Sequence, residues 1–414
     1  MKILFMTHLY PPARGGAELL ASRVAVELAR RGNRVKVVTT EALSTGAFFI
    51  GDKRRVSPSF QNLDGVEVER LPFATFGSGV LNFLRRVACR VDFPGGDLLR
   101  TYSFGPRQPL YVKRAEEFAP DLVIATPLPT YNTAYAVRYC RTFRKPLILC
   151  PCYHIVDGEA FDNPLFYRWM GEASSVVALT PEEKAHLVGK GVGEEKIRII
   201  PPIPLEEEPE ALLGRAPSKE EARRNLGIPQ EAKVVFFLGQ HGPHKKIKEL
   251  FQACRILFSR DPRCHLLFAG GTSALTPGFH ALANEIFDYG RERVHLFDDF
   301  QQSLKPSLFR AADLFAFLSE HESFGIALTE AMAYALPCVI SRNGVGIYQV
   351  EEYRQGLWVE PRSPEEVARG MEEILADPAL VERMGRASFE AAREFGPKRL
   401  LDLWCALVEE GNGR

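Results

Sequence analysis

Residues 2–40 read KILFMTHLYPPARGGAELLASRVAVELARRGNRVKVVTT and contain the pattern of one β-α-β unit. The apolar run at 2–7 predicts a buried strand, and the proline- and glycine-rich loop at 8–16 ends it. The next segment repeats its apolar residues every three to four positions up to Gly32, which predicts an amphipathic helix. Residues 34–40 then predict a second strand. Two parallel strands joined by a helix are the starting unit of a doubly wound parallel sheet.

The same alternation of short apolar strands and amphipathic helices continues along the chain. Further strands are expected at 121–125, 146–150, 176–179, 197–200, 233–238, 264–269, 293–296, 314–318, 338–340 and 356–359. Residues 201–217 interrupt the alternation with five prolines and an acidic run, the composition of a linker. We therefore expect two successive α/β domains, at 1–204 and 205–390. A C-terminal helix at about 391–414 is available to pack back onto the first.

Composition and charge limit the class of protein. The chain has 414 residues, of which 46% are hydrophobic and 25% charged, so it can bury a sizeable core, which excludes a disordered or fibrous protein. The net charge is zero, which gives no support for nucleic-acid binding. Residues 1–204 hold 27 Lys and Arg against 20 Asp and Glu, a net of +7, and the remainder holds 25 against 32, a net of −7. This split predicts two domains with different partners.

The sequence also predicts a compartment. No stretch approaches the roughly 18 apolar residues that span a bilayer, and the apolar run at the N-terminus is too short for a signal peptide. The eight cysteines are scattered through apolar runs, which is typical of free thiols in a reducing compartment. We expect a cytoplasmic protein, with peripheral contact to the inner membrane face left open.

The segment at 319–333, SEHESFGIALTEAMA, follows an expected strand. It predicts a loop that contains Glu322 and a helix that begins near Gly325 and contains Glu330. The free N–H groups and partial positive charge of a helix N-terminus suit a phosphate, and a carboxylate in the first turns suits ribose hydroxyls. Periodicity alone favours a buried helix with incidental glutamates.

This segment resembles the Glu-x7-Glu motif of retaining glycosyltransferases of the GT-B fold, family GT4 in particular. The family pattern stands here as Glu322-Ser-Phe324-Gly325, four residues, then Glu330-Ala-Met-Ala. One departure is Ala335, where the family usually has glycine. The resemblance implies two Rossmann-like domains that face a central cleft. It also implies a hexosyltransferase that moves a sugar from a nucleoside diphosphate onto a glycan, lipid or small-molecule acceptor with retained anomeric configuration.

Residues 237–247, FLGQHGPHKKI, resemble the family's Gly-Arg…Lys-Gly loop, which grips the donor diphosphate. Lys245 matches the family lysine. Gln240 stands where arginine is usual, and Lys246 where glycine is usual. The family uses these cations in place of a metal ion, so the resemblance implies no metal and no cofactor beyond the donor. One expected cation is missing, and Lys246, His241 and His244 are candidate replacements.

Two segments of the first half also resemble the family. Residues 10–18, YPPARGGAE, resemble the Gly-Gly loop that faces the donor from the opposite domain. This loop is not a GxGxxG fingerprint, which disfavours a nicotinamide dinucleotide. In the family a histidine near the position of His154 reaches the transferred sugar or the acceptor, and His8 is the second candidate for that role.

The resemblance thus implies a set of site residues. His154 and Glu322 are the implied catalytic residues; Lys245 and the amides near Phe324 hold the diphosphate, and Glu330 takes the ribose hydroxyls. The implied donor-binding residues are Gly15, Gly16, Gly239, Gln240, Lys245, Lys246, Gly271, Phe324, Gly325, Ile326 and Glu330.

A basic segment lies between residues 81 and 114. It contains seven Lys and Arg against Asp92 and Asp97, with apolar residues between them. One interpretation is a single amphipathic helix with a solvated face. The other is a site for an anionic acceptor or an anionic membrane surface.

Three rival functions remain from the sequence. One is a GT-B enzyme of another activity, such as a nucleotide-sugar hydrolase, an epimerase or a phosphorylase. Another is a glycosidase that uses Glu322 and Glu330 as its two carboxylates. The last is a non-catalytic protein that binds nucleotide sugars, because Gln240 breaks the family motif.

Overall fold

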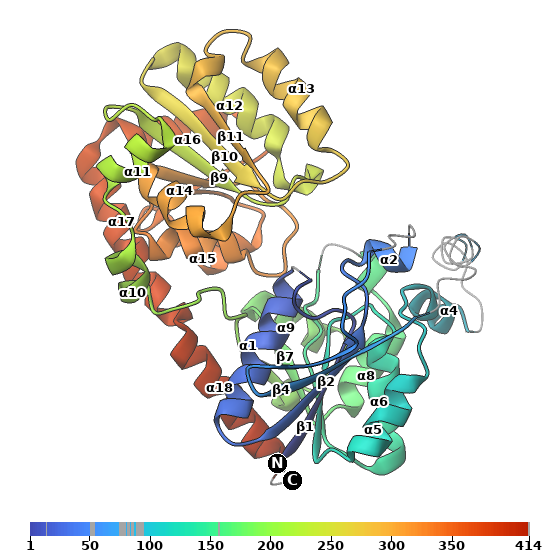
Figure 1. Cartoon of the computed structure of the whole chain (residues 1–414). Coiled ribbons are helices and arrows are strands. Elements are labelled where there is room, and N and C mark those ends of the chain that lie inside the picture. The colour runs from blue at the N-terminus through green and yellow to red at the C-terminus, as the bar shows by residue number, and fades with distance from the viewer. Residues whose placement is uncertain are drawn as a thin grey trace. The chain divides into compact units, whose positions relative to one another are not determined.

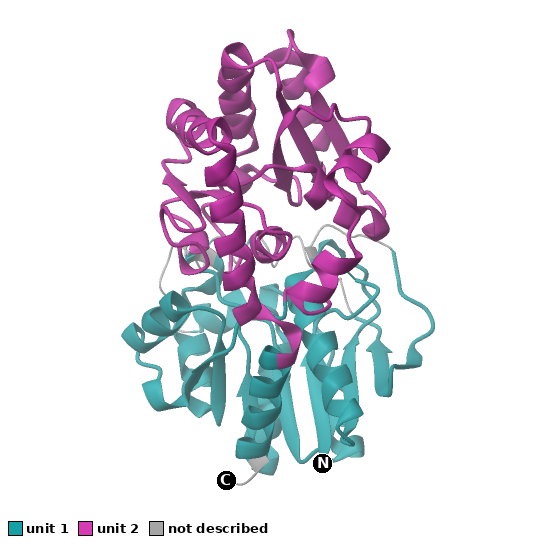
Figure 2. Cartoon of the chain, turned by 90° about the vertical axis from the view of Figure 1, so that its left-hand side faces the viewer, with its two compact units in different colours: residues 1–203, 399–414 teal, residues 204–398 magenta. Residues whose placement is uncertain are grey.

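The computed structural model describes the chain except for residues 14, 50–53, 74–79, 81–82, 84–86, 88–94, 156–157 and 413–414. The chain divides into two compact units (Figure 2). Unit 1 contains Met1–Ile203 together with Arg399–Arg414, and unit 2 contains Pro204–Lys398.

Unit 1 is built on an eight-stranded sheet with the order β3-β4-β2-β1-β5-β6-β7-β8. The strands are β1 (Lys2–Thr7), β2 (Arg34–Thr40), β3 (Phe60–Leu63), β4 (Val66–Leu71), β5 (Leu122–Thr126), β6 (Leu147–Leu149), β7 (Ser175–Ala178) and β8 (Ile197–Ile199). Every pairing is parallel except that of β3 with β4. The strand order reverses between β1 and β5, so the loops after these two strands diverge, which creates space for a ligand at the carboxyl edge.

Helices pack on the sheet of unit 1 and bury its apolar strands. They are α1 (Gly16–Arg30), α2 (Gly46–Phe49), α4 (Gly96–Ser103), α5 (Leu110–Phe118), α6 (Asn132–Phe143), α7 (Gly158–Phe161), α8 (Pro164–Glu172), α9 (Pro181–Gly189) and α18 (Pro397–Asn412). The last helix joins the N-terminal residues in this unit: the Trp404 side chain is buried, and Glu410 lies 3.6 Å from Arg198.

Unit 2 is built on a six-stranded, wholly parallel sheet with the order β11-β10-β9-β12-β13-β14 (Figure 1). The strands are β9 (Lys233–Leu238), β10 (Cys264–Gly270), β11 (Val294–Asp298), β12 (Leu314–Phe317), β13 (Cys338–Ser341) and β14 (Gly356–Val359). Counted within the unit, this is the doubly wound order 3-2-1-4-5-6, with the reversal between β9 and β12.

Two apolar layers cover the faces of the unit 2 sheet, one on each side (Figure 1). The helices are α10 (Pro209–Arg215), α11 (Lys219–Leu226), α12 (Ile247–Arg260), α13 (Thr276–Ile286), α14 (Lys305–Ala311), α15 (Ile326–Ala333), α16 (Pro364–Ala376) and α17 (Pro378–Ala392). One layer includes α12, α13 and α16, and the other includes α11, α14 and α15. These layers confirm the predicted doubly wound α/β class.

Three expectations about local structure need correction. The expected linker at 201–217 contains a helix, α10, because Pro209 at its first position needs no N–H partner there. Strands β3 and β4 were not expected. The basic segment is not one helix, because α4 and α5 are separate.

Much of the basic segment, including Arg85, Arg86 and Arg90, lies outside the described residues. Its described cations contact neighbouring groups. Arg100 donates a hydrogen bond to the carbonyl of Asp162 (3.0 Å), and Arg114 pairs with Glu69 (2.6 Å). Membrane contact by this segment stays a prediction. Of the helices that the structure describes, none has the length and hydropathy needed to span a membrane.

Candidate active site

The candidate site in unit 2 is the carboxyl edge of its sheet. Four loops meet there: 239–246 after β9, 271–275 after β10, 299–301 after β11 and 318–325 after β12. Parallel strands place their following loops at one edge, and the reversal between β9 and β12 separates two of them. These loops contain most of the donor-binding residues that the sequence predicts.

Lys245 and Glu322 form a close ion pair at this edge. Lys245 ends the short turn Pro243–Lys245 that precedes α12, and Glu322 lies on the loop after β12. The Lys245 Nζ atom contacts Oε1 of Glu322, and the two side chains are 13% and 18% exposed. The structure therefore brings together two residues that the sequence placed on separate motifs, in surroundings where water screens their charges only in part.

A second ion-pair group lies on the same loop after β12. Glu320 is 8% exposed, and its Oε2 atom lies 2.6 Å from Lys246 Nζ. Its Oε1 atom accepts a hydrogen bond from Arg362 Nε at 2.9 Å. Burial by itself would raise the pKa of Glu320, but the hydrogen bonds from Arg362 and Lys246 outweigh it, and the pKa lies below its ordinary value. Sequence reasoning missed Glu320 and Arg362.

The turn that begins α15 requires glycine. Gly325 has φ +91°, and a Cβ atom there would lie 2.8 Å from Cζ of Phe317. The buried Gln349 side chain holds this turn, because its Nε2 atom donates to the carbonyl of Phe324 at 2.7 Å. Thr329 in turn donates to Gln349 Oε1 at 2.6 Å. The first N–H groups of α15 are thereby fixed beside the loop that contains Glu322.

Glu330 lies inside α15, as the sequence predicts, and its side chain is 13% exposed. Lys305, at the start of α14, donates a hydrogen bond to Oε1 of Glu330 at 2.7 Å. The lysine is a functional neighbour that the sequence did not reveal, because 25 residues separate the two and no motif joins them.

The loops after β9 and β10 approach each other closely. A Cβ atom on Gly270 would overlap the carbonyl oxygen of Gly239. Next to it, the Asp299 carboxylate accepts a hydrogen bond from the Thr272 N–H at 3.0 Å. Glycine at 270 therefore allows the contact, and a Cβ atom on Gly271 would lie 3.9 Å from the Asp299 carboxylate.

His241 does not replace the missing cation of this loop. Its side chain is buried, and Nδ1 lies 2.9 Å from Oγ1 of Thr276. Burial lowers the pKa of His241, against a smaller opposing effect of Asp298, so the ring is neutral at pH 7. Gln240, where the family arginine is expected, is exposed.

In unit 1, the predicted glycines lie at the start of α1. Gly15 is the N-cap residue, and a Cβ atom on it would overlap the Glu18 carboxylate, which folds back over it. Oε1 of Glu18 lies 3.3 Å from Nε2 of His8, and both side chains are buried. Burial lowers the pKa of His8 despite this carboxylate. His8 therefore lies beside Gly15 and Gly16 at the carboxyl end of β1.

His154 lies after β6 at the carboxyl edge of the unit 1 sheet, half-buried, with its ring 5.2 Å from that of Phe161. A carboxyl group holds the backbone next to it. Glu183 accepts hydrogen bonds from the N–H groups of Tyr153 (3.3 Å) and Leu179 (2.7 Å). Burial raises the pKa of Glu183 to about 8, and the two N–H groups oppose this in part. Sequence reasoning missed Glu183.

Two family models match the chain and together span most of it. The model of group 1 glycosyl transferases matches residues 218–391, and a glycosyl transferase 4-like domain matches residues 15–202. The chain is a group 1 glycosyltransferase of the GT4 type. This result confirms the family and the enzyme class predicted from the Glu-x7-Glu segment.

The relatives of this glycosyltransferase cover nearly its whole length. D-inositol 3-phosphate glycosyltransferase of Corynebacterium glutamicum (strain R) is 28% identical over 392 residues, which is 92% of this chain and 88% of the relative. The enzyme of that name from Thermomonospora curvata is also 28% identical, over 96% of this chain and 92% of the relative.

Solved structures resemble the glycosyltransferase along its whole length. Anabaena HepE in complex with UDP and glucose has a TM-score of 0.72 at 20% identity, and 99% of this chain and 100% of that chain are covered. Sucrose-phosphate synthase from Thermosynechococcus elongatus has a TM-score of 0.71 at 16% identity, with 99% and 98% covered. These similarities confirm the GT-B fold.

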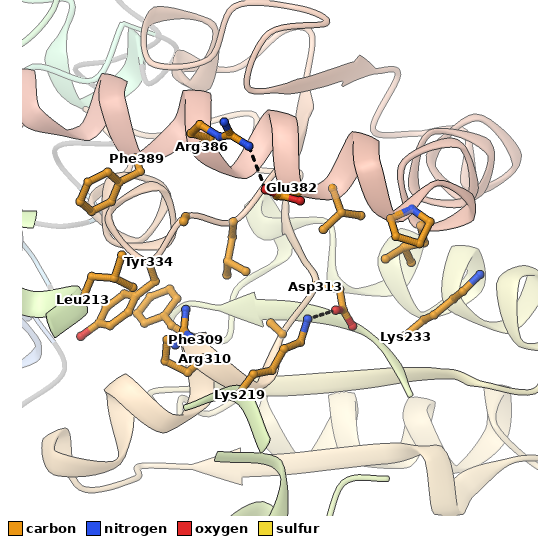
Figure 3. Close-up of a pocket in the computed structure, with 16 residues that line it drawn as sticks. Leu213, Lys219, Lys233, Phe309, Arg310, Asp313, Tyr334, Glu382, Arg386 and Phe389 are labelled. Atoms are coloured by element: carbon orange, nitrogen blue, oxygen red, sulfur yellow. Dashed lines mark hydrogen bonds and ion pairs between the residues drawn. The ribbon is translucent and has the colours of Figure 1, made fainter. Parts of the chain in front are cut away.

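A pocket of about 560 Å³ lies elsewhere in unit 2 of the glycosyltransferase (Figure 3). It is lined at the amino edge of the sheet, where Lys233 begins β9 and Asp313 precedes β12. Phe309, Tyr334 and Phe389 form much of its apolar wall. None of the predicted site residues lines this pocket, so we place the active site at the opposite edge.

Within the residues that the structure describes, no three His, Cys, Asp or Glu side chains are grouped to hold a metal ion. Metal independence therefore stays a proposal, which depends on what the lysine residues can do for the departing phosphate.

Proposed function

We propose that this glycosyltransferase transfers a sugar from a nucleoside diphosphate to an acceptor, with retention of the anomeric configuration and without a metal ion. The observation that carries the proposal is the Lys245–Glu322 ion pair beside the start of α15 and beside Glu330. A cation, a helix N-terminus and two carboxylates at one sheet edge match the parts of a nucleotide sugar. These parts are a diphosphate, a ribose and a hexose with several hydroxyl groups.

The donor would replace the internal ion pair. On binding, the diphosphate takes Lys245 Nζ and the N–H groups at the start of α15 as partners. Glu322 then loses its cation, and its carboxylate is free to accept hydrogen bonds from the sugar hydroxyls. Glu330, which Lys305 holds at 2.7 Å, accepts hydrogen bonds from the ribose hydroxyls. Lys245 thus has an anionic partner both with and without donor, and Glu322 is left to the uncharged sugar hydroxyls.

Lys245 also assists the chemical step. When the bond between the anomeric carbon and the phosphate oxygen breaks, negative charge grows on the diphosphate, and a fixed cation beside it lowers the barrier. The departing phosphate oxygen then accepts the proton of the acceptor hydroxyl, which attacks from the same face. Retention follows from that geometry. His154 orients the sugar or the acceptor in this scheme.

The relatives support particular substrates. HepE was solved in complex with UDP and glucose, which supports a UDP-sugar as the donor. Relatives named D-inositol 3-phosphate glycosyltransferase support a phosphorylated polyol as the acceptor. The described cysteines are free and buried, which supports action in a reducing cytoplasm.

Glu322→Ala tests the site. We expect transfer to fall by about a thousandfold, because the sugar loses its carboxylate partner, while nucleoside diphosphate binding is kept or tightened because Lys245 loses its internal competitor. The measurements are product formation from UDP-glucose and D-inositol 3-phosphate and calorimetric titration with UDP. The control is Glu351→Ala, which removes an exposed carboxylate of the same unit paired with Arg354.

Retention of activity within about tenfold, or roughly 1.4 kcal/mol, would show that the site is assigned wrongly. The same assay separates transfer from hydrolysis of the donor, because hydrolysis releases free glucose in place of a glycosylated acceptor. Activity on a glycoside without any nucleotide would instead point to a glycosidase.

A further inference from the structure

Lys246 adopts a backbone conformation that favours glycine. Its φ and ψ are +55° and +41°, in the left-handed region, where a side chain costs about 1 kcal/mol relative to glycine. The residue is the N-cap of α12 and its side chain makes no capping hydrogen bond. The interactions of the ammonium group must therefore offset the cost of this backbone conformation.

The ammonium of Lys246 is held by a carboxylate that a second cation shares. Glu320 contacts Lys246 Nζ through Oε2 (2.6 Å) and Arg362 through both oxygens (2.9 Å and 3.3 Å). Arg362 also lies near the carboxylates of Glu360 and Glu249. The Lys246 side chain is 14% exposed and that of Arg362 is 69% exposed. The Lys246 ammonium is thus part of the loops at the edge and is not a solvated surface lysine.

Gln240 and His241 do not supply a second cation beside Lys245. Gln240 is neutral, and His241 is a neutral buried ring directed at Thr276. Along residues 239–246, all of which the structure describes, Lys245 and Lys246 are the side chains with a permanent positive charge. Their partners, Glu322 and Glu320, are two positions apart on one loop.

We propose that Lys246 is the second cation for the donor diphosphate, and that Glu320 and Arg362 are positioning residues that hold its ammonium at the site. The proposal rests on the proposed function, because it assumes a diphosphate beside Lys245. Arg362 shares the Glu320 carboxylate, so that Glu320 holds Lys246 without serving it alone. The usual arginine at position 240 is then unnecessary.

Lys246→Gly separates this role from a structural one. Glycine removes the ammonium and relieves the backbone strain, but it also takes one of its two cationic partners from the nearly buried Glu320. We expect the midpoint of thermal unfolding without ligand to stay the same or fall by a few degrees, while UDP binds about tenfold more weakly. Uridine, which has no phosphate, should bind the variant and the wild type equally.

Ala335→Gly is the matched control. Ala335 also has a positive φ (+58°), but it lines the pocket at the opposite edge of the sheet. This variant should gain stability and leave UDP binding unchanged. An equal UDP affinity of wild type and Lys246→Gly, within about twofold, would overturn the proposal.

Two further variants test whether a cation at position 240 can replace Lys246 and whether Arg362 helps to position Lys246. Adding Gln240→Arg to Lys246→Gly should restore most of the UDP affinity, because it returns a cation to the loop. Arg362→Gln should weaken UDP binding about threefold without changing stability, since an exposed ion pair contributes little to folding, and Arg362→Lys should recover the loss. Failure of both recoveries would contradict the proposal. Absence of UDP, GDP or ADP binding by the wild type would instead refute the donor site itself.

Discussion

The two units of this glycosyltransferase present different chemistry at the carboxyl edges of their sheets. Unit 2 has partly exposed lysine–glutamate pairs there: Lys245–Glu322, Lys246–Glu320 and Lys305–Glu330. Unit 1 has buried carboxyl groups instead. Glu18 pairs with the buried ring of His8, and Glu183 accepts two backbone N–H groups. The edge with the lysines belongs to the half of the sequence with a net charge of −7.

The difference shows that the charge of a domain says little about its site. An anionic donor meets only the few groups within several ångströms, because solvent screens the more distant charges. The Lys245–Glu322 pair of unit 2 is exposed enough to exchange its carboxylate for a phosphate. The two carboxyl groups of unit 1 are too buried for exchange: Glu18 contacts the His8 ring, and Glu183 holds backbone in place. We call the edge of unit 2 exchangeable, because its ion pair can take a ligand phosphate in place of a carboxylate. We call the edge of unit 1 fixed, because its buried carboxyl groups cannot.

The largest expected effect tests the fixed edge through pH. The folded-state pKa of Glu183 is about 8, above its unfolded value of 4.5, so the folded protein binds the extra proton. The stability that this proton contributes is complete below pH 4.5 and is lost as the pH rises towards about 8. Glu183→Gln removes this loss. Relative to wild type, the variant should gain on the order of 3 kcal/mol between pH 5 and pH 8.

Urea unfolding at several pH values measures this gain. The control is Glu182→Gln, which changes the exposed neighbour in the same helical turn. It should keep the pH dependence of the wild type. The same pH dependence in Glu183→Gln would show that the carboxyl is ionised throughout. Unit 1 would then resemble unit 2 in carrying a charged edge.

Next in size is a test of a feature that the two edges share, a buried carboxamide that donates hydrogen bonds to backbone carbonyls. In unit 1, Asn132 Nδ2 donates to the carbonyls of Met6 (3.2 Å) and Thr126 (3.1 Å). In unit 2, Gln349 Nε2 donates to the carbonyl of Phe324, and Gln349 Oε1 accepts a hydrogen bond from the Thr329 hydroxyl. Asn132→Leu and Gln349→Met should each cost about 2 kcal/mol, because both leave buried carbonyls unpaired.

The two substitutions should differ in their effect on binding. Gln349→Met frees the turn at the start of α15 and should weaken UDP binding about tenfold. Asn132→Leu should leave UDP binding within about twofold of wild type, since no residue it contacts is assigned to the diphosphate. Chemical unfolding and calorimetric titration provide the two measurements. Equal losses of binding would remove the distinction between the edges.

Much of the fold could be predicted from the sequence because its signals are local. Strands β2 and β9 occupy residues 34–40 and 233–238 as predicted. Strand β4 was missed because charged residues alternate with its apolar ones, VEVERL, over only six positions. Helix α10 was missed because Pro209 was assigned to a linker.

The site was predictable one residue at a time but not in its contacts. The positions of Lys245, Glu322 and Glu330 follow from motifs. Their partners depend on which strands are neighbours, and periodicity does not contain that information. Arg362 reaches Glu320 across 42 residues of sequence. For the same reason, the sequence could not show that the His241 ring is directed at Thr276 and does not serve as a replacement cation.

The smallest expected effect compares the two units at backbone positions that favour glycine. Ala119 ends α5 in unit 1 with φ +49°, and Ala335 in unit 2 has φ +58°. Glycine at either position removes a side chain from the left-handed region, which should raise stability by about 1 kcal/mol. Ala119 is exposed, so it gives up no packing, whereas the half-buried Ala335 methyl offsets part of its gain. Ala119→Gly should therefore stabilise slightly more in urea unfolding. A loss of stability in either variant would show that the chain relaxes the strain locally, and the cost assigned to Lys246 would then be too large.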